Sequence, residues 1–66
     1  MQKQDYIEKI AAYIVEDWNA ADAGDQQACR MAKRGALSIA QEAADSLGHS
    51  AGNWLAEAQF RAADLY

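Results

Sequence analysis

The sequence predicts an all-α fold, a small three-helix bundle, and three observations lead to this prediction. Sixteen of the 66 residues are alanine, which has the highest helix propensity, and the chain contains no proline. Val15 and four isoleucines are the only β-branched aliphatic residues, so strand-forming residues are scarce. Glycines divide the chain into amphipathic segments, which predict helices at roughly residues 3–22, 26–47 and 51–65.

The first predicted helix is supported by apolar residues at helical spacing. Intervals of three and four residues place them on one face, which we expect to be buried with Trp18 as its largest member. These residues are Ile7, Ile10, Ile14, Trp18 and Ala21. After the segment, Gly24 suits the left-handed conformation that stops a helix, and Asp25 suits the N-cap of the next helix.

The second predicted helix has a buried face of mainly small residues, so a neighbouring helix can approach it closely. That face consists of Cys29, Ala32, Ala36, either Ile39 or Ala40, Ala43 and Leu47. Gly35 lies in the middle of this segment, where glycine costs up to about 1 kcal/mol relative to alanine. It marks either a close helix crossing or a break in the helix.

The third predicted helix follows Gly48, a second candidate stop, and either Ser50 or Asn53 is its candidate N-cap. Its expected buried residues are Trp54, Leu55, Ala58, Ala62 and Leu65. The connections "AGD" and "GHS" are short, and short connections favour antiparallel neighbouring helices.

The length of the chain predicts one small helical domain, residues 1–66. A domain of this size buries only about 60% of the surface that its unfolded chain exposes, so partner binding or a homodimer would help to stabilise it. Cys29 is the single cysteine, so no internal disulfide forms, which suits a reducing cytosol. No apolar run approaches the roughly 20 residues of a membrane span, and the N-terminal residues contain no signal-peptide core. We therefore expect a cytoplasmic protein with no membrane contact.

Charge is unevenly distributed along this chain, whose net charge is −4. Residues 1–28 contribute −4 (six acids and two lysines) and residues 35–66 contribute −3, whereas the stretch between them contributes +3 from Arg30, Lys33 and Arg34. An acidic chain repels nucleic acid unless its basic residues gather on one face. We therefore expect no direct binding of nucleic acid.

The acidic stretch "DWNAADAGDQQA", which begins at Asp17, invites comparison with the calcium-binding EF-hand loop. When Asp17 takes the first position, Asp22 replaces the glycine of the sharp turn and Ala28 replaces the final bidentate glutamate. The stretch fits better as the end of one helix at Gly24 and the start of the next at Asp25.

Residues that form catalytic or cofactor-binding constellations are missing from the sequence. His49 is the only histidine and lies in a predicted turn, and Cys29 lies on an apolar helix face. No second Cys or His stands at metal-ligand spacing, and no glycine-rich phosphate loop occurs. A bundle this small also offers little concave volume for a substrate. The sequence therefore predicts a protein that is not an enzyme and that holds neither a cofactor nor a metal.

The segment "AKRGALS" has a second interpretation, as the turn of a helix-turn-helix DNA reader with Arg30, Lys33 and Arg34 near phosphate. Against it, the would-be recognition helix contains Glu42 and Asp45 and no Lys or Arg, which would bring acids into the major groove. A continuous second helix with solvated charges is the preferred interpretation. A small helix-turn-helix regulator and a structural or assembly module remain the alternatives.

Carboxylates on the first predicted helix and the turn after it form the candidate partner-binding site. Some lie opposite the apolar face at intervals that place neighbours about 5–6 Å apart at Cβ, and Phe60 adds an apolar anchor, with Tyr6 and Tyr13 as further aromatic residues among the acids. The predicted contact residues are Asp5, Glu8, Glu16, Asp17, Asp22, Asp25 and Phe60. The alternative makes these acids a solubilising surface and Phe60 a residue that packs against a second helix or a dimer mate.

With carboxylates such as Glu8 and Glu16 on helices and no cofactor motif, the chain resembles small acidic phage-encoded inhibitors, including anti-CRISPR proteins that imitate DNA. The resemblance covers the whole chain in composition and charge layout and includes no diagnostic motif. It implies an inhibitor that occupies the nucleic-acid-binding surface of a larger basic protein, such as a CRISPR effector subunit, in the host cytoplasm. Arg30, Lys33 and Arg34 depart from a pure DNA mimic and leave a bipolar surface or self-association open.

Overall fold

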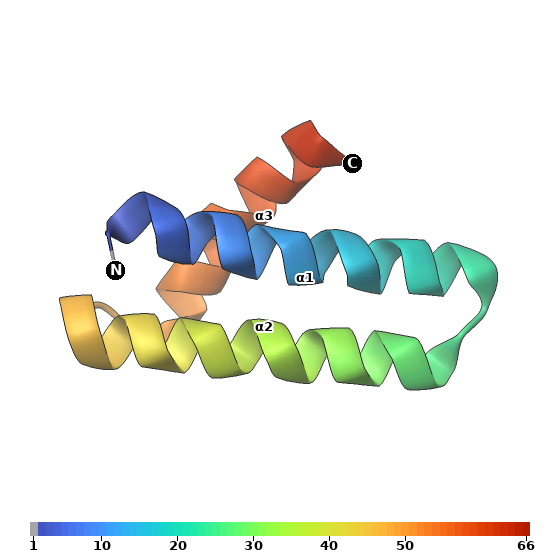
Figure 1. The fold of residues 1–66 in the computed structure, drawn as a ribbon, viewed down its shortest axis with the longest axis horizontal. Helices are drawn as coiled ribbons and strands as arrows, with labels where there is room; N and C mark the ends of the chain where they lie inside the picture. The colour runs from blue at the N-terminus through green and yellow to red at the C-terminus, as the bar shows by residue number, and fades with distance from the viewer. Residues whose placement is uncertain (1) are drawn as a thin grey trace.

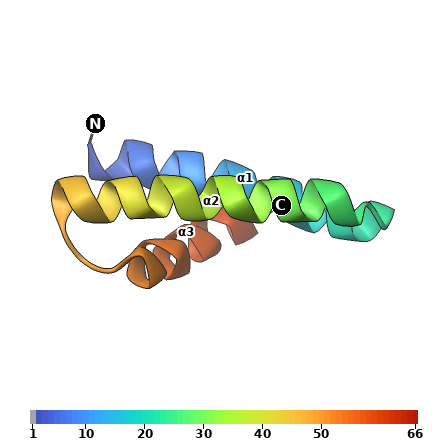
Figure 2. The same cartoon turned by 90° about the horizontal axis from the view of Figure 1, so that it is seen from below.

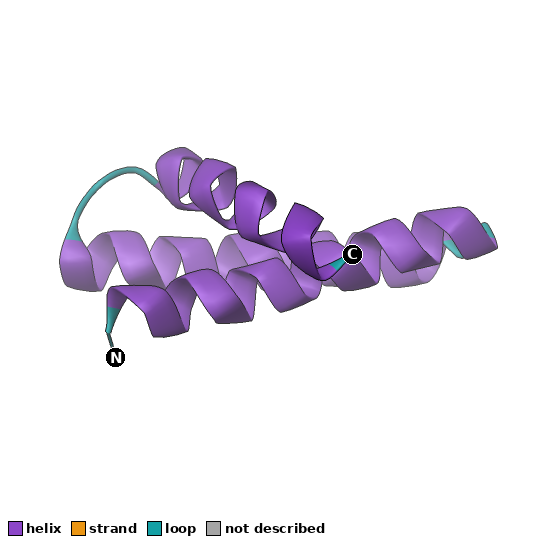
Figure 3. Cartoon of the chain, turned by 90° about the horizontal axis from the view of Figure 1, so that it is seen from above, coloured by secondary structure: helices purple, strands orange, loops and turns teal. Residues whose placement is uncertain are grey.

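The structure, a computed structural model, describes residues 2–66, and it confirms the predicted all-α three-helix bundle. The helices of the described residues are α1 (Lys3–Ala23), α2 (Gln26–Leu47) and α3 (Ala51–Leu65), so each end lies within one residue of its predicted position. Figure 1 shows α1 and α2 as an antiparallel hairpin, with α3 crossing it obliquely. In Figure 3, α3 forms a second layer on one face of this hairpin.

The helix ends follow from local sequence as predicted. Gly24 ends α1 in the left-handed conformation (φ 74°, ψ 20°), and the Asp25 carboxylate accepts a hydrogen bond of 3.0 Å from the backbone N–H of Ala28 to begin α2. Of the two candidate N-caps of α3, Ser50 and Asn53, the structure shows Ser50. Its hydroxyl accepts a hydrogen bond from the backbone N–H of Asn53 at 3.2 Å. Gly48 ends α2 with φ 90° and ψ −172°, a region that essentially only glycine adopts.

The core lies where α3 crosses the hairpin, at the N-terminal half of α1. Trp54 and Ile10 are its largest fully buried side chains. The buried residues among those described are Tyr6, Ile7, Ile10, Ala11, Ala20, Ala32, Ala36, Ala40, Ala43, Trp54, Ala58 and Ala62. The hairpin extends beyond α3 at its turn end, which is the end where Gly24 and Asp25 connect α1 to α2 (Figure 2).

The buried face predicted for α1 was wrong toward the turn end. Ile14 and Trp18 are only half-buried and Ala21 is exposed, whereas Ala11 and Ala20 are buried. The reason is that α1 has two neighbours: α2 lies along its whole length, whereas α3 crosses its N-terminal half and reaches Trp18 only with its C-terminal end (Figure 1). Near its N-terminus, α1 therefore buries residues on more than one face. Near the turn, its apolar residues are only partly buried.

The other helices bury fewer large residues than predicted. On α2, Ala40 rather than Ile39 is buried, and Cys29 is half-buried. On α3, Leu55 is half-buried. Leu47 and Leu65, at the last position of each helix, are 46% and 47% exposed because no helix covers these ends.

Gly35 marks a close crossing, because α2 runs through it without a break. A Cβ atom built at Gly35 would lie 2.5 Å from Cε1 of Tyr13, so the aromatic ring of Tyr13 occupies the space that a side chain would need. The preferred continuous helix is thereby confirmed. The turn of the helix-turn-helix interpretation does not form, since "AKRGALS" is helical throughout.

Candidate protein-binding site

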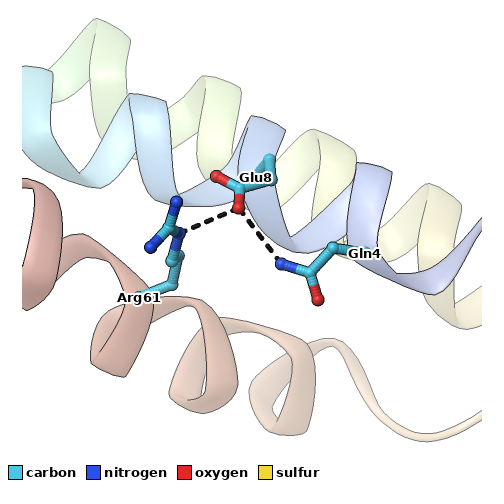
Figure 4. A network of polar contacts seen from close by, with 3 residues as sticks. All are labelled: Gln4, Glu8 and Arg61. Carbon is cyan, nitrogen blue, oxygen red and sulfur yellow. Dashed lines mark hydrogen bonds and ion pairs between the residues drawn. The ribbon is translucent and has the colours of Figure 1, made fainter.

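The predicted acidic stripe on α1 is interrupted at Glu8. The Glu8 carboxylate accepts from Arg61 Nε on α3 at 2.8 Å and from Gln4 Nε2 at 3.1 Å (Figure 4). Glu8 was expected to face away from the core, but the crossing of α3 over this part of α1 brings Arg61 to it. Lys9 is exposed four residues after Asp5, so a cation also stands within the expected stripe.

Two ion pairs are found among residues 2–66, and both join α1 to α3. Glu8 pairs with Arg61 at 2.8 Å, and Lys3 pairs with Glu57 at 3.6 Å. The Glu8 and Arg61 side chains are each 40% exposed, so solvent screens their attraction and the pair contributes at most about 1 kcal/mol. The ion pair with Arg61 engages the Glu8 carboxylate within the bundle. Glu8 is therefore a weak candidate for a contact with another molecule.

Asp5 has a local structural role at the start of α1. Its carboxylate accepts from the backbone N–H of Gln2 at 3.3 Å, as part of a capping box that satisfies free amides of the first turn. The negative charge also lies at the positive end of the helix dipole, where it is favourable. The helix end therefore accounts for Asp5 without a partner protein.

The remaining predicted acids gather at the turn end of the hairpin, and we call them the turn-end acids. They are Glu16, Asp17, Asp22 and Asp25. None of them lies within ion-pair distance of a cation among residues 2–66, and the stretch 10–29 contains no Lys or Arg. Asp25 caps α2, and that hydrogen bond leaves its charge in place. The turn end thus holds acids that have no ion-pair partner within the described residues.

Asp22 connects the turn end to the last residue of the chain. Its carboxylate accepts a hydrogen bond from the Tyr66 hydroxyl, and this bond raises the pKa of Tyr66. The Tyr66 ring meets Trp18 edge to face, with 5.2 Å between ring centroids. These contacts hold the end of α3 against the second half of α1.

The basic residues Arg30, Lys33 and Arg34 are exposed on the first half of α2, which lies beside the second half of α1 (Figure 1). Asp17 and Lys33 line one hollow on the side of α3, and Glu16 and Arg34 line another hollow formed by α1 and α2 alone. No ion pair bridges either hollow among the described residues. The turn end is therefore bipolar, with an acidic side on α1 and a basic side on α2.

An apolar groove runs beside α3 where that helix leaves the hairpin uncovered. It has a volume of about 470 Å³ and is lined by residues of all three helices, including Trp18, Leu37 and Leu55. Sequence reasoning missed Leu37, which is 44% exposed, because it lies just outside the alanine face of α2. Phe60 is 80% exposed, and with Trp18 it lines a shallow hollow next to the groove.

The expected aromatic set among the acids does not exist at the surface. Tyr6 is buried, meets Trp54 edge to face at 6.0 Å, and its hydroxyl donates to Ser46 Oγ at 3.3 Å. Tyr13 is half-buried against Gly35. Both were placed on the acidic side of α1 from helix geometry alone, but α2 packs against that part of the helix. Of the expected set of Tyr6, Tyr13 and Phe60, only Phe60 is exposed.

Cys29 is half-buried, and its thiol donates to the backbone carbonyl of Asp17 at 3.6 Å. Partial burial, and after it the Asp17 carboxylate, raises the pKa of the Cys29 thiol. Because the thiolate is the reactive form, we expect iodoacetamide at neutral pH to modify Cys29 more slowly in the folded protein than in urea-unfolded protein. Mass spectrometry over time measures both rates. Equal rates, after correction for the effect of urea on a free-cysteine standard, would show that the fold does not protect this thiol.

The remaining findings concern metals, membranes and known proteins. Within residues 2–66, no three His, Cys, Asp or Glu side chains lie close enough together to hold a metal ion. No helix in this part of the chain combines the length and the apolar character of a membrane span. Comparison of the chain with protein families, with curated proteins and with solved structures finds no match.

Proposed function

We propose that this chain is a non-enzymatic binding protein that occupies the nucleic-acid-binding surface of a larger basic protein, and that it does so with three of its turn-end acids, Glu16, Asp22 and Asp25. The observation that carries the proposal is that these carboxylates have no ion-pair partner among residues 2–66, although Arg34 of α2 lines the same hollow as Glu16. Glu16, Asp22 and Asp25 are also exposed, although Asp22 accepts a hydrogen bond from Tyr66 at the end of the chain.

In this proposal the chain inhibits its partner by competing with nucleic acid for the partner's Lys and Arg side chains. Proteins that bind nucleic acid place Lys and Arg against phosphates, and those contacts supply much of the affinity. Carboxylates held on helices offer the same cations an alternative partner, and the long-range field steers the encounter. The CRISPR effector subunits suggested by the resemblance are one such class of partner, and the bacterial cytoplasm, where the Cys29 thiol stays reduced, is where we place the activity.

The contact set proposed from the structure is smaller than that predicted from the sequence. Glu8 is paired with Arg61, Asp5 lies at the other end of α1 with the exposed Lys9 one helical turn away, and Asp17 lines the groove together with Lys33. Glu16, Asp22 and Asp25 remain, on α1 and in the turn that follows it. They lie at the same end of the hairpin, so their charges act together.

The test is a variant that removes three charges and keeps the shape, Glu16→Gln/Asp22→Asn/Asp25→Asn. Asparagine is as good an N-cap as aspartate, and surface substitutions usually change stability by no more than about 0.5 kcal/mol, so folding should be retained. Immobilised wild-type protein is expected to capture a nucleic-acid-binding protein from a bacterial lysate at low salt. Added duplex DNA should release it, and the triple variant should capture much less because association slows.

The matched control removes three exposed carboxylates elsewhere, as Glu42→Gln/Asp45→Asn/Asp64→Asn. It has the same net charge as the test variant, so an effect of overall charge alone would appear in both. Capture that survives in the triple variant, or that duplex DNA does not release, contradicts the proposal and makes these acids a solubilising surface.

A further inference from the structure

We propose that the chain forms a two-fold symmetric homodimer in which Phe60 of each copy enters the apolar groove of the other. The observations are an exposed aromatic side chain, an apolar groove on the same side of the molecule, and two opposite charges at that groove. None of them is used by the proposed function, which rests on Glu16, Asp22 and Asp25.

Phe60 and the groove belong to one continuous surface. The hollow beside Phe60 shares Trp18 and Gln59 with the groove. A two-fold interface uses the same patch on both subunits, so a patch that holds both a protruding ring and a receiving groove can be self-complementary. At about 470 Å³ the groove lies within the range of cavities that hold ligands of drug size, so it has room for an aromatic ring.

The charges at the groove favour a second copy over a foreign partner. Asp17 on α1 and Lys33 on α2 both line it, and neither has an ion-pair partner among residues 2–66. In a two-fold dimer, Asp17 of one copy meets Lys33 of the other, and this happens twice. A uniformly basic partner would meet Lys33 and a uniformly acidic one would meet Asp17, and like charges brought together are unfavourable.

The composition of the core explains why such a dimer would be energetically favourable. Eight of the buried residues are alanines, and only Trp54 and Ile10 are large and fully buried. A small bundle with this core buries little apolar surface per residue, and association is one way for a short chain to bury more. Phe60, 80% exposed, and Leu37, 44% exposed, supply the additional apolar surface.

Sedimentation equilibrium of the full chain over a range of concentrations tests the proposal. Wild-type protein is expected to be dimeric at high concentration, and Phe60→Gln is expected to weaken the dimer by more than about tenfold, as for an aromatic anchor. Met31→Gln is the matched control because Met31 is also exposed, at 66%, but lines the hollow that lacks α3. A chain that stays monomeric, or a dimer lost with Met31→Gln and kept with Phe60→Gln, overturns the proposal.

A charge exchange tests the reciprocal contact separately. The Asp17→Lys variant places two cations at its groove and the Lys33→Glu variant places two anions there, so each is expected to be monomeric alone. Mixed together they should form a heterodimer, because both contacts are then between opposite charges. Circular dichroism of each variant checks that it remains folded. Two folded variants that each dimerise alone as the wild type does, or that do not associate when mixed, contradict the contact between Asp17 and Lys33.

Discussion

Trp54→Ala is expected to remove a large share of the protein's free energy of unfolding and to lower its melting midpoint strongly. Trp54 is 1% exposed, its ring meets Tyr6, and its Nε1 donates to the Gly48 carbonyl at 2.8 Å. Truncating a buried aromatic residue costs about 3–5 kcal/mol. For a chain of 66 residues the whole free energy of unfolding is about 3–10 kcal/mol, at 0.05–0.15 kcal/mol per residue. One side chain on α3 thus accounts for a large share of the stability.

Thermal melting followed by circular dichroism measures this effect, and Trp18→Ala is the matched control. Trp18 is the other tryptophan and is only half-buried, so its truncation should leave a cooperative transition at a lower temperature. Trp54→Phe should fall between the two, because it keeps most of the apolar contact and loses the hydrogen bond to Gly48. A Trp18→Ala variant less stable than Trp54→Ala would place the centre of the core near the turn end instead of under α3.

Gly35→Ala is the second substitution for which we expect a large effect. It should lower the stability of the protein, whereas helix propensity alone predicts an increase. Alanine at an exposed helix position stabilises by about 1 kcal/mol relative to glycine. At this position the new methyl group would lie 2.5–2.8 Å from three ring atoms of Tyr13, and overpacking of this kind costs about 1–3 kcal/mol. The net result is a loss of stability, with a midpoint lower by about 4–8 °C for each kcal/mol in a domain of this size.

A double-mutant cycle separates the clash from propensity. In a Tyr13→Ala background the ring is absent, so Gly35→Ala should raise the melting midpoint instead of lowering it. This change of sign is specific to a steric contact between the two residues. Stabilisation by Gly35→Ala in the otherwise wild-type chain would mean that Tyr13 moves aside at little cost and that α1 and α2 do not depend on this close approach.

The helices were predictable from the sequence because their ends depend on neighbouring residues. Gly24 and Gly48 stop helices through backbone conformations that suit glycine, and Asp25 and Ser50 cap helices by accepting amide hydrogen bonds three residues ahead. These interactions act within a few residues, and so the pattern of residue types is sufficient to locate them. The alanine face of α2 was predictable for the same reason, since helical periodicity is local.

The candidate site was only partly predictable. The acids of the turn end and the exposure of Phe60 follow from position along a helix. The ion pair between Glu8 and Arg61 could not be predicted in this way, because these residues are 53 positions apart and meet only where α3 crosses α1. The groove at Leu37 escaped prediction in the same way, since it exists only where α3 leaves the hairpin.

By itself, then, the sequence determined three helices, their ends, the small-residue face of α2 and a bipolar distribution of charge. Tertiary structure alone decided that Trp54 and not Trp18 is the central tryptophan, that Gly35 is a crossing point, and which acids lack an internal partner. The physical reason is that α3 is shorter than the hairpin and crosses it at an angle. Burial and pairing at each position depend on where that crossing falls, and helical periodicity contains no information about it.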